Sequence, residues 1–346
     1  MRLDVVDIIK GISILMIVNV HLVSGQFFSV GSSFHVIAFF FVAGLVMGLK
    51  EVWGSVAVGP FIRRKAAQLL YPYLTLSGCY ILFRLVLNLI RGNVCFDSVV
   101  TGAMRDTVLF QGVGTLWFFP VLFMGEVIFF LAKKYKVNDI VLILVGVAAV
   151  FLASALNQKG YGGVRWYTQF LSAFISVLFM EIGYLSYKHF SSFFANDPIS
   201  GKRAWTLGGL VVALYGALYY LMRFYRGDLH KLDIGNPFIY LACSLMGLML
   251  VVSASVIFGR YLYKCGAPVK KWGQDSIIIM TTHAEYFITS IVYLAIMKAL
   301  SVLNIVLDGM ILSGLSLAVI MMVEMGVCYV VRHTPLSLLY TKPSRL

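Results

Sequence analysis

Long, unbroken runs of apolar residues constrain this chain more than any other feature of its sequence. Each run has about 20 residues, the length that an α-helix needs to cross the hydrocarbon core of a membrane. The runs lie at residues 5–25, 34–50, 69–90, 115–132, 138–156, 167–187, 205–223, 236–258, 276–299 and 305–331. Because they are continuous and do not alternate in polarity, they predict helices rather than barrel strands. We therefore expect an all-α polytopic membrane protein, a bundle of about ten transmembrane helices.

Composition supports a membrane protein and a single domain. The 346 residues are 60% hydrophobic and only 12% charged, whereas soluble domains carry about 25% charged residues. For a polytopic membrane protein, this length fits one helical bundle. We therefore expect one transmembrane domain over residues 1–332, followed by a short cytoplasmic tail over residues 333–346.

The basic residues predict the orientation of the helices. With ten spans, most of the 28 lysines and arginines fall in segments on the same side of the membrane as the N-terminus. Cytoplasmic segments are enriched in Lys and Arg, so both termini are expected in the cytoplasm. The net charge of +13 is then explained by orientation and by contact with membrane lipids. No basic stretch resembles a nucleic-acid-binding module, and we expect no nucleic acid as a partner.

The first two runs contain polar side chains that lipid would not tolerate without a partner. Lys10 and His21 are eleven residues apart, which is about three helical turns plus 20°, so they share one helix face about 16 Å apart along the axis. His35 opens the second run. We interpret this pair of helices as one wall of a polar tunnel. Gly44 and Gly48 have the small-xxx-small spacing that lets another helix approach closely.

The cytoplasmic segment after the second run contains Arg63, Arg64 and Lys65. One interpretation is charge that sets orientation and contacts lipid head groups. The other is a cradle for a phosphorylated ligand such as a nucleotide-derived cofactor, since Arg matches phosphate oxygens. The proline between Tyr71 and Tyr73 is expected to kink the next helix, which would bring two hydroxyl groups near the interface.

Three further residues are candidates for a site. Glu126 lies about 17 Å into the fourth run; an intramembrane carboxylate marks either a functional site or a salt bridge to another helix. Trp117 suits an interfacial anchor. His283, in the ninth run next to Thr281 and Thr282, is either a site residue or a histidine whose hydrogen bonds are satisfied by hydroxyls.

Other polar residues suggest no chemistry of their own. Arg105 and Asp106 are expected to pair in an outer loop, and His189 and His230 are interpreted as solvated loop residues. The five cysteines form no CxxC motif, and no group of His, Cys and acidic residues has zinc-ligand spacing, so no metal is expected. Nucleotide-binding and serine-hydrolase motifs are also missing from the sequence.

Taken in order, these residues resemble the integral-membrane acyltransferase 3 family, which includes bacterial glycan O-acetyltransferases and fucose 4-O-acetylase-like proteins. The resemblance extends over nearly the whole chain. Five elements carry it: Arg2, Asp4, Lys10 and His21; the segment Phe34 to Gly44, with Ile37 and Ala43 where the family usually has proline and serine; the basic residues before Leu70-Tyr71-Pro72-Tyr73, with Gln68 at the second place of an RxxR pattern found in some members; Leu116-Trp117-Phe118; and His283.

The resemblance implies a multi-pass protein of the bacterial inner membrane. It also implies O-acetyl transfer from cytosolic acetyl-CoA, the acyl donor, to a hydroxyl of a glycan or lipid-linked saccharide. A neutral imidazole can take the proton from an attacking hydroxyl, so His21 is expected to be a general base, or a nucleophile that carries the acyl group. Lys10 would orient the donor or stabilise the thioester oxyanion.

The remaining candidates are assigned to the two substrates. Arg63, Arg64, Lys65 and Tyr73 are expected to bind the donor, and His35, Trp117, Glu126 and His283 the acceptor. Two alternatives stay open from the residues alone: a transporter or flippase for a glycan or small polar substrate, with the same residues along its path, and a non-catalytic membrane scaffold.

Overall fold

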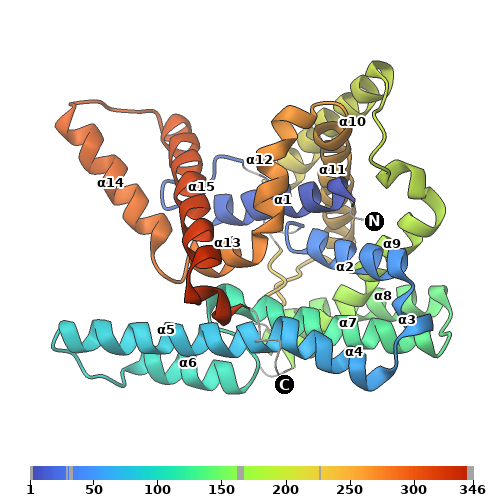
Figure 1. The fold of residues 1–346 in the computed structure, drawn as a ribbon, viewed down its shortest axis with the longest axis horizontal. Helices are drawn as coiled ribbons and strands as arrows, with labels where there is room; N and C mark the ends of the chain where they lie inside the picture. Colours follow the sequence, from blue (N-terminus) through green and yellow to red (C-terminus); the bar gives the residue numbers. More distant parts are fainter. Residues whose placement is uncertain (1–2, 29, 31–33, 162–166, 226, 341–346) are drawn as a thin grey trace. The chain divides into compact units, whose positions relative to one another are not determined.

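A computed structural model describes the chain except residues 1–2, 29, 31–33, 162–166, 226 and 341–346. Every regular element in the described part is a helix, as expected (Figure 1). Seven segments are long and apolar enough to cross a membrane: Val58–Ile90, Gly114–Lys134, Asp139–Tyr161, Thr168–Phe194, Gly201–Leu221, Pro237–Arg260 and Gly309–His333. Two shorter apolar helices, Ile37–Lys50 and Ile288–Val302, accompany them. The protein is therefore an all-α polytopic membrane protein.

The chain forms two compact units. The first comprises Met1–Lys50, Phe179–Leu229 and Ile234–Cys328, and the second Glu51–Leu178, His230–Asp233 and Tyr329–Leu346. The first unit contains α1 (Asp4–Val20), α2 (Ile37–Lys50), the later part of α9 (Thr168–Phe194), α10 (Gly201–Leu221), α11 (Pro237–Arg260), α12 (Tyr263–Gln274), α13 (Ser276–Thr282), α14 (Ile288–Val302) and most of α15 (Gly309–His333). The second contains α3 (Val52–Ser55), α4 (Val58–Lys65), α5 (Tyr71–Ile90), α6 (Ser98–Val108), α7 (Phe118–Lys134) and α8 (Asp139–Leu156).

In the first unit, α1 crosses and packs closely against α12, a helix that lies between the eighth and ninth predicted runs (Figure 1). Two glycines allow the backbones to approach. A Cβ added to Gly11 would lie 1.9 Å from the carbonyl oxygen of Val269, and one added to Gly273 would lie 1.7 Å from that of Asp7. Lys270 pairs with Asp4 at 2.7 Å on the same contact. The short apolar stretch within residues 260–275 concealed this helix from sequence reasoning.

The expected close approach at Gly44 and Gly48 is confirmed. A Cβ at Gly44 would lie 1.9 Å from the carbonyl oxygen of Met180 in α9, and a Cβ at Gly48 would lie 2.8 Å from the ring of Tyr184. Gly183 in α9 makes the reciprocal close approach to α2, since its added Cβ would lie 2.0 Å from the carbonyl oxygen of Phe41. Small residues on both helices therefore let α2 and α9 pack backbone to backbone.

Two predicted spans have different boundaries in the structure. The first helix ends at Val20, so His21 is the residue just after it and not part of its interior. The ninth run, predicted as one helix over 276–299, is broken between α13 and α14, and Phe287 takes a left-handed backbone conformation with φ of 61°. In a membrane, such irregular backbone is tolerated where it is buried in protein or lines a water-filled cavity.

The outer segment 91–114 also differs from the loop that we expected, because it contains α6. Asp97 caps this helix by accepting a hydrogen bond from the backbone N–H of Val100 at 2.8 Å. That bond holds the pKa of the Asp97 carboxyl below its usual value.

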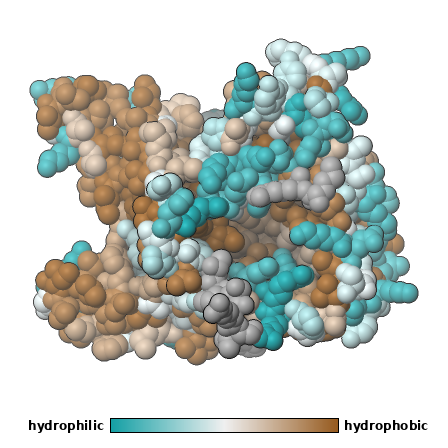
Figure 2. Space-filling view, viewed as in Figure 1, coloured by the Kyte–Doolittle hydropathy of each residue, from teal (hydrophilic) through white to brown (hydrophobic). Residues whose placement is uncertain are grey.

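Exposed apolar side chains cover α14, including Ile291, Leu294 and Val302, and the surface over this helix is largely hydrophobic in Figure 2. A lipid-facing position accounts for them.

The contact between α2 and α9 predicts a specific sensitivity to side-chain volume. Gly44→Ala should destabilise the protein by about 1–3 kcal/mol, the usual cost of overpacking a tight contact. Gly209→Ala in α10 is the matched control, since nothing lies within 4 Å of an added Cβ there, and alanine favours a helix over glycine. The free energy of unfolding in mixed micelles measures both. Equal stability of the two variants would contradict the packing described for Gly44.

Candidate functional site

Three histidines from separate segments lie together in the first unit. His21 follows α1, His35 precedes α2 and His283 follows α13. The ring centres of His21 and His283 are 5.1 Å apart, and the rings are tilted by 57°. His35 lies close enough to His21 for their charges to interact. The structure thus unites three side chains that the sequence placed on separate runs.

The members of this histidine cluster differ in accessibility. His21 is exposed, His35 is half-buried and His283 is completely buried. The Nδ1 of His283 is 2.8 Å from the carbonyl oxygen of Ile279. A ligand that approaches the cluster therefore meets His21 before it meets His283.

The loop that carries His21 is held by a residue that sequence reasoning missed. Asn19 is fully buried near the end of α1. Its amide nitrogen donates to the carbonyl oxygen of Phe28, and its amide oxygen accepts from the Phe28 backbone N–H, both at 2.9 Å. Ser313 adds a tie by donating to the carbonyl oxygen of Ser24 at 3.1 Å. These bonds hold the segment that follows His21 in the sequence.

Two acidic residues near the cluster were also missed. Asp228 is half-buried and close enough to His21 to interact with it electrostatically. Glu324 is completely buried within α15 and accepts a hydrogen bond from the Thr282 hydroxyl at 2.6 Å. A carboxyl group deep in the last apolar run was a visible signal for Glu324. Nothing in the loop around Asp228 distinguished it from its charged neighbours.

Lys10 is paired on its own helix. Its ammonium group is 2.9 Å from the carboxylate of Asp7, which is buried, and the Gln274 amide lies 3.5 Å from the other oxygen of that carboxylate. Asp7 is N-terminal to Lys10 and His21 is C-terminal to it, so the Lys10 side chain points away from the histidine cluster. The two groups are about 16 Å apart along the helix axis. They would therefore contact different parts of any bound ligand.

In the second unit, Lys65 and Glu126 form a largely buried ion pair at 2.8 Å, with 16% and 7% of their side chains exposed. Phe61 stacks on Phe130 beside them, with ring centres 3.8 Å apart. The structure thus joins two residues that we had assigned to different substrates, and it fits the salt bridge we had considered for Glu126. Arg63 and Arg64 are exposed on the same helix.

A wide helical turn follows these basic residues. Residues Ala66–Leu70 form a π-helix that includes the exposed Gln68 and leads directly into α5. Pro72 lacks an N–H, and its ring would clash with the carbonyl oxygen four residues earlier, so a wider turn is expected ahead of it. The kink that we expect from this proline is replaced in the structure by a π-helical turn just before it.

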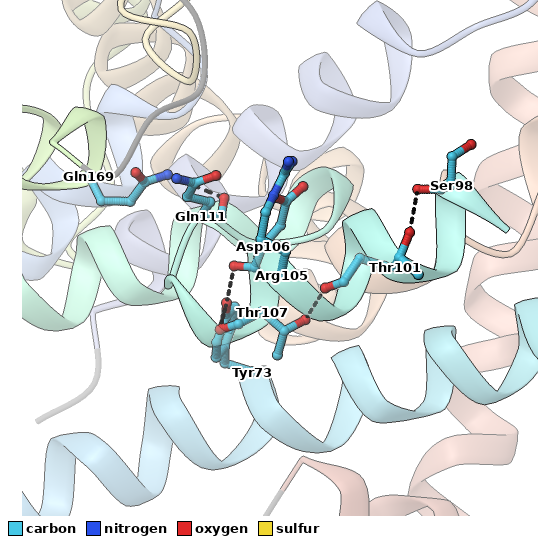
Figure 3. Close-up of polar contacts among 9 residues, drawn as sticks. Tyr73, Ser98, Thr101, Arg105, Asp106, Thr107, Gln111 and Gln169 are labelled. Atoms are coloured by element: carbon cyan, nitrogen blue, oxygen red, sulfur yellow. Dashed lines mark hydrogen bonds and ion pairs between the residues drawn. The ribbon is translucent and has the colours of Figure 1, made fainter. Parts of the chain in front are cut away.

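The hydroxyl of Tyr73 is used within the second unit. Tyr73 is fully buried, and its hydroxyl donates to the carbonyl oxygens of Thr107 at 2.9 Å and Asp106 at 3.3 Å (Figure 3). These bonds attach the end of α6 to α5. Arg105 and Asp106 pair at 2.9 Å, as expected from the sequence. Donor binding by Tyr73 stays a prediction, and its hydrogen bonds already give it a structural role.

Trp117 is almost fully buried and stacks on His230, with ring centres 4.9 Å apart and an angle of 12° between the rings. Our interpretation of His230 as a solvated loop residue was wrong, because its ring packs on Trp117. Nothing in the sequence indicated this contact, since the two residues are more than 100 positions apart.

In the described part of the chain, no group of three or more His, Cys, Asp or Glu residues is arranged to hold a metal ion.

Comparison with known proteins identifies the family of this arrangement. A family model described as an acyltransferase domain matches residues 3–331, which is nearly the whole chain. Comparison with curated proteins and with solved structures gave no match.

The Lys65–Glu126 pair predicts a large coupling energy. Glu126→Gln leaves a buried ammonium group without its partner, which should cost about 3–5 kcal/mol of unfolding free energy. Lys65→Met should have a similar effect, and the double variant should recover part of the loss. Breaking the exposed Arg105–Asp106 pair by Arg105→Ala is the control and should cost less than about 1 kcal/mol. Additive effects at positions 65 and 126 would show that the pair contributes nothing.

Proposed function

The chain belongs to the acyltransferase 3 family, so it is a membrane acyltransferase, and we propose that it moves an acetyl group from cytosolic acetyl-CoA to a hydroxyl of an extracytoplasmic glycan or lipid-linked saccharide. The observation that carries this proposal is the histidine cluster, in which His21 is exposed and packs against the buried His283. An accessible imidazole on a fixed loop is a suitable base for an alcohol, which is a weak nucleophile.

Direct transfer requires one proton carrier. In this proposal, the acceptor hydroxyl gives its proton to His21 while its oxygen attacks the thioester carbonyl carbon. The new C–O bond forms, the C–S bond breaks, and the CoA thiolate takes the proton from His21. An alternative order, in which His21 first carries the acetyl group as a covalent intermediate, uses the same residue. Both orders predict that activity depends on His21.

The exposed arginines are our candidates for binding the donor phosphates. Since Lys65 is engaged with Glu126, Arg63 and Arg64 are the members of the basic segment that present charge at the surface. Arg is suited to phosphate because its planar group offers paired N–H donors. Lys10 points away from His21, so we propose that it orients a part of the donor remote from the thioester.

The acceptor is assigned to the outer side of the histidine cluster. His35 is the best-supported acceptor residue, because it lies near His21. Trp117 and Glu126 are already engaged with His230 and Lys65, and acceptor binding by these two residues stays a prediction. We further propose that the protein lies in the bacterial inner membrane with both termini in the cytoplasm, as the distribution of basic residues suggests.

Purified protein with labelled acetyl-CoA and candidate glycans tests the role of His21. His21→Ala should reduce transfer by at least about 100-fold, the lower range of a general base, while the protein stays folded. His189→Ala in α9 is a matched control and should retain wild-type transfer, since His189 is an exposed residue outside the cluster. Full activity of His21→Ala would overturn the proposed role. Glycan translocation by the wild type without acetyl transfer would instead support the transporter alternative.

Binding of acetyl-CoA tests the basic segment separately. Arg64→Ala should weaken binding several-fold, and raised salt should weaken wild-type binding, because the attraction is between exposed charges. Arg203→Ala removes an equally exposed arginine at the start of α10 and should leave the dissociation constant unchanged. Equal affinity of Arg64→Ala and wild type would remove this segment from the donor site without affecting the role of His21.

A further inference from the structure

One ring nitrogen of His283 is a buried hydrogen-bond acceptor without a partner. A carbonyl oxygen can only accept, so the Nδ1 of His283, 2.8 Å from the carbonyl oxygen of Ile279, must carry the hydrogen. In the neutral ring, the Nε2 then has a lone pair and no hydrogen. This Nε2 is buried and makes no hydrogen bond, an arrangement that costs free energy unless a donor satisfies it.

The hydroxyl groups beside His283 are already used. The Thr282 hydroxyl oxygen lies 2.9 Å from the carbonyl oxygen of Ile278 and 2.6 Å from the Glu324 carboxyl, so its one hydrogen is already shared between these two acceptors. Thr281 makes its bond to the carbonyl oxygen of Ile278 at 2.9 Å. Because His283 is completely buried, an acceptor substrate does not reach it directly. A neighbouring side chain can supply the donor.

His21 is at the right distance to be that donor. An imidazole nitrogen lies roughly 1 Å from its ring centre, so rings separated by 5.1 Å can bring two facing nitrogens to about 3 Å, the length of a hydrogen bond. The exposed His21 ring has room to turn, whereas the His283 ring is held by Ile279. A rotation of one side chain would make the bond.

We propose that His283 is a positioning residue that accepts a hydrogen bond from His21 and thereby selects the tautomer of His21. The inference rests on the proposed role of His21 as base or nucleophile. With one nitrogen of His21 donating to the Nε2 of His283, the other nitrogen carries the lone pair. That second nitrogen faces the accessible side and is ready to accept a proton or an acetyl group. Fixing the tautomer through the second nitrogen is a general device for reactive and ligating histidines.

The backbone break after α13 explains how the sequence builds this arrangement. His283 keeps a helical backbone conformation, and its backbone N–H donates to the carbonyl oxygen of Ile279 at 3.2 Å. Here the helix ends at Thr282, and the His283 carbonyl oxygen accepts from the backbone N–H of Thr289 at 3.1 Å. The break thus secures His283 by its backbone and its ring together, which is what a positioning residue needs.

Two substitutions of His283 test the roles of its two ring nitrogens separately. His283→Gln can place an amide oxygen near the position of Nε2, so it retains the acceptor that faces His21. His283→Asn can place an amide N–H near the position of Nδ1, so it retains the bond to Ile279 only. We expect the glutamine variant to keep kcat for acetyl transfer within about tenfold of wild type. The asparagine variant should lose at least about 100-fold in kcat, with the KM for acetyl-CoA little changed.

The reverse order would overturn the proposal. Activity retained by asparagine and lost by glutamine would show that His283 acts only through its structural bond to Ile279. Thr281→Ala, two residues before His283 and outside the histidine pair, is the control for local disturbance. Thermal unfolding of each variant in detergent identifies any loss of kcat that follows from misfolding.

A readout without turnover keeps the proposal testable even if the acetyl-transfer function is wrong. Nitrogen-15 spectra of the histidine-labelled protein should show a protonated Nδ1 and an unprotonated, hydrogen-bonded Nε2 for His283. His21→Ala should shift the Nε2 signal and leave the Nδ1 signal in place. An unshifted Nε2 signal would reject the hydrogen bond between the two histidines, whatever reaction the protein performs.

Discussion

Hydrocarbon offers no hydrogen bonds, and this constraint governs how the chain uses its few polar residues. A polar group inside a membrane protein must find its partner within the protein or face a water-filled cavity. Several buried polar groups in the described part of the chain do find partners: Lys65 with Glu126, Lys10 with Asp7, Glu324 with Thr282, and Asn19 with the Phe28 backbone. The histidine cluster is different, because His21, which lies close to both other histidines, is exposed.

On the basis of that difference, we propose that the paired residues hold the fold and that the histidine cluster does the chemistry. An ion pair that is nearly buried, such as Lys65–Glu126, is costly to form and more costly to break, so it suits a fixed contact between helices. An accessible imidazole beside a buried one suits a reaction. The family match shows a membrane acyltransferase, and the exposure of His21 makes this residue our proposed base.

The sequence predicted the helices well where the apolar runs were long. It predicted the approach at Gly44 because small-xxx-small spacing is a local signal, and it singled out His21, His35 and His283 because such residues are costly in lipid. It could not predict the end of α1 at Val20, the break after Thr282 or the helix at α12. Those features depend on backbone contacts, such as Gly273 with Asp7, that bring distant segments together.

Pairing between distant residues was the other limit. Glu126 was recognised as either functional or paired, and only the structure identifies Lys65 as its partner. His230 was judged by its loop, whereas Trp117 determines its surroundings. Asp228 was not singled out at all, because its interaction with His21 depends on how a loop folds back on the first unit.

The central claim is that His21 presents a reactive imidazole at the place where the donor binds. Modification of His21 by diethyl pyrocarbonate, quantified by mass spectrometry with and without a non-hydrolysable acetyl-CoA analogue, tests this claim directly. The account predicts rapid modification of the free protein and strong protection by the analogue. Slow modification of His21, or a rate that the analogue leaves unchanged, would contradict it.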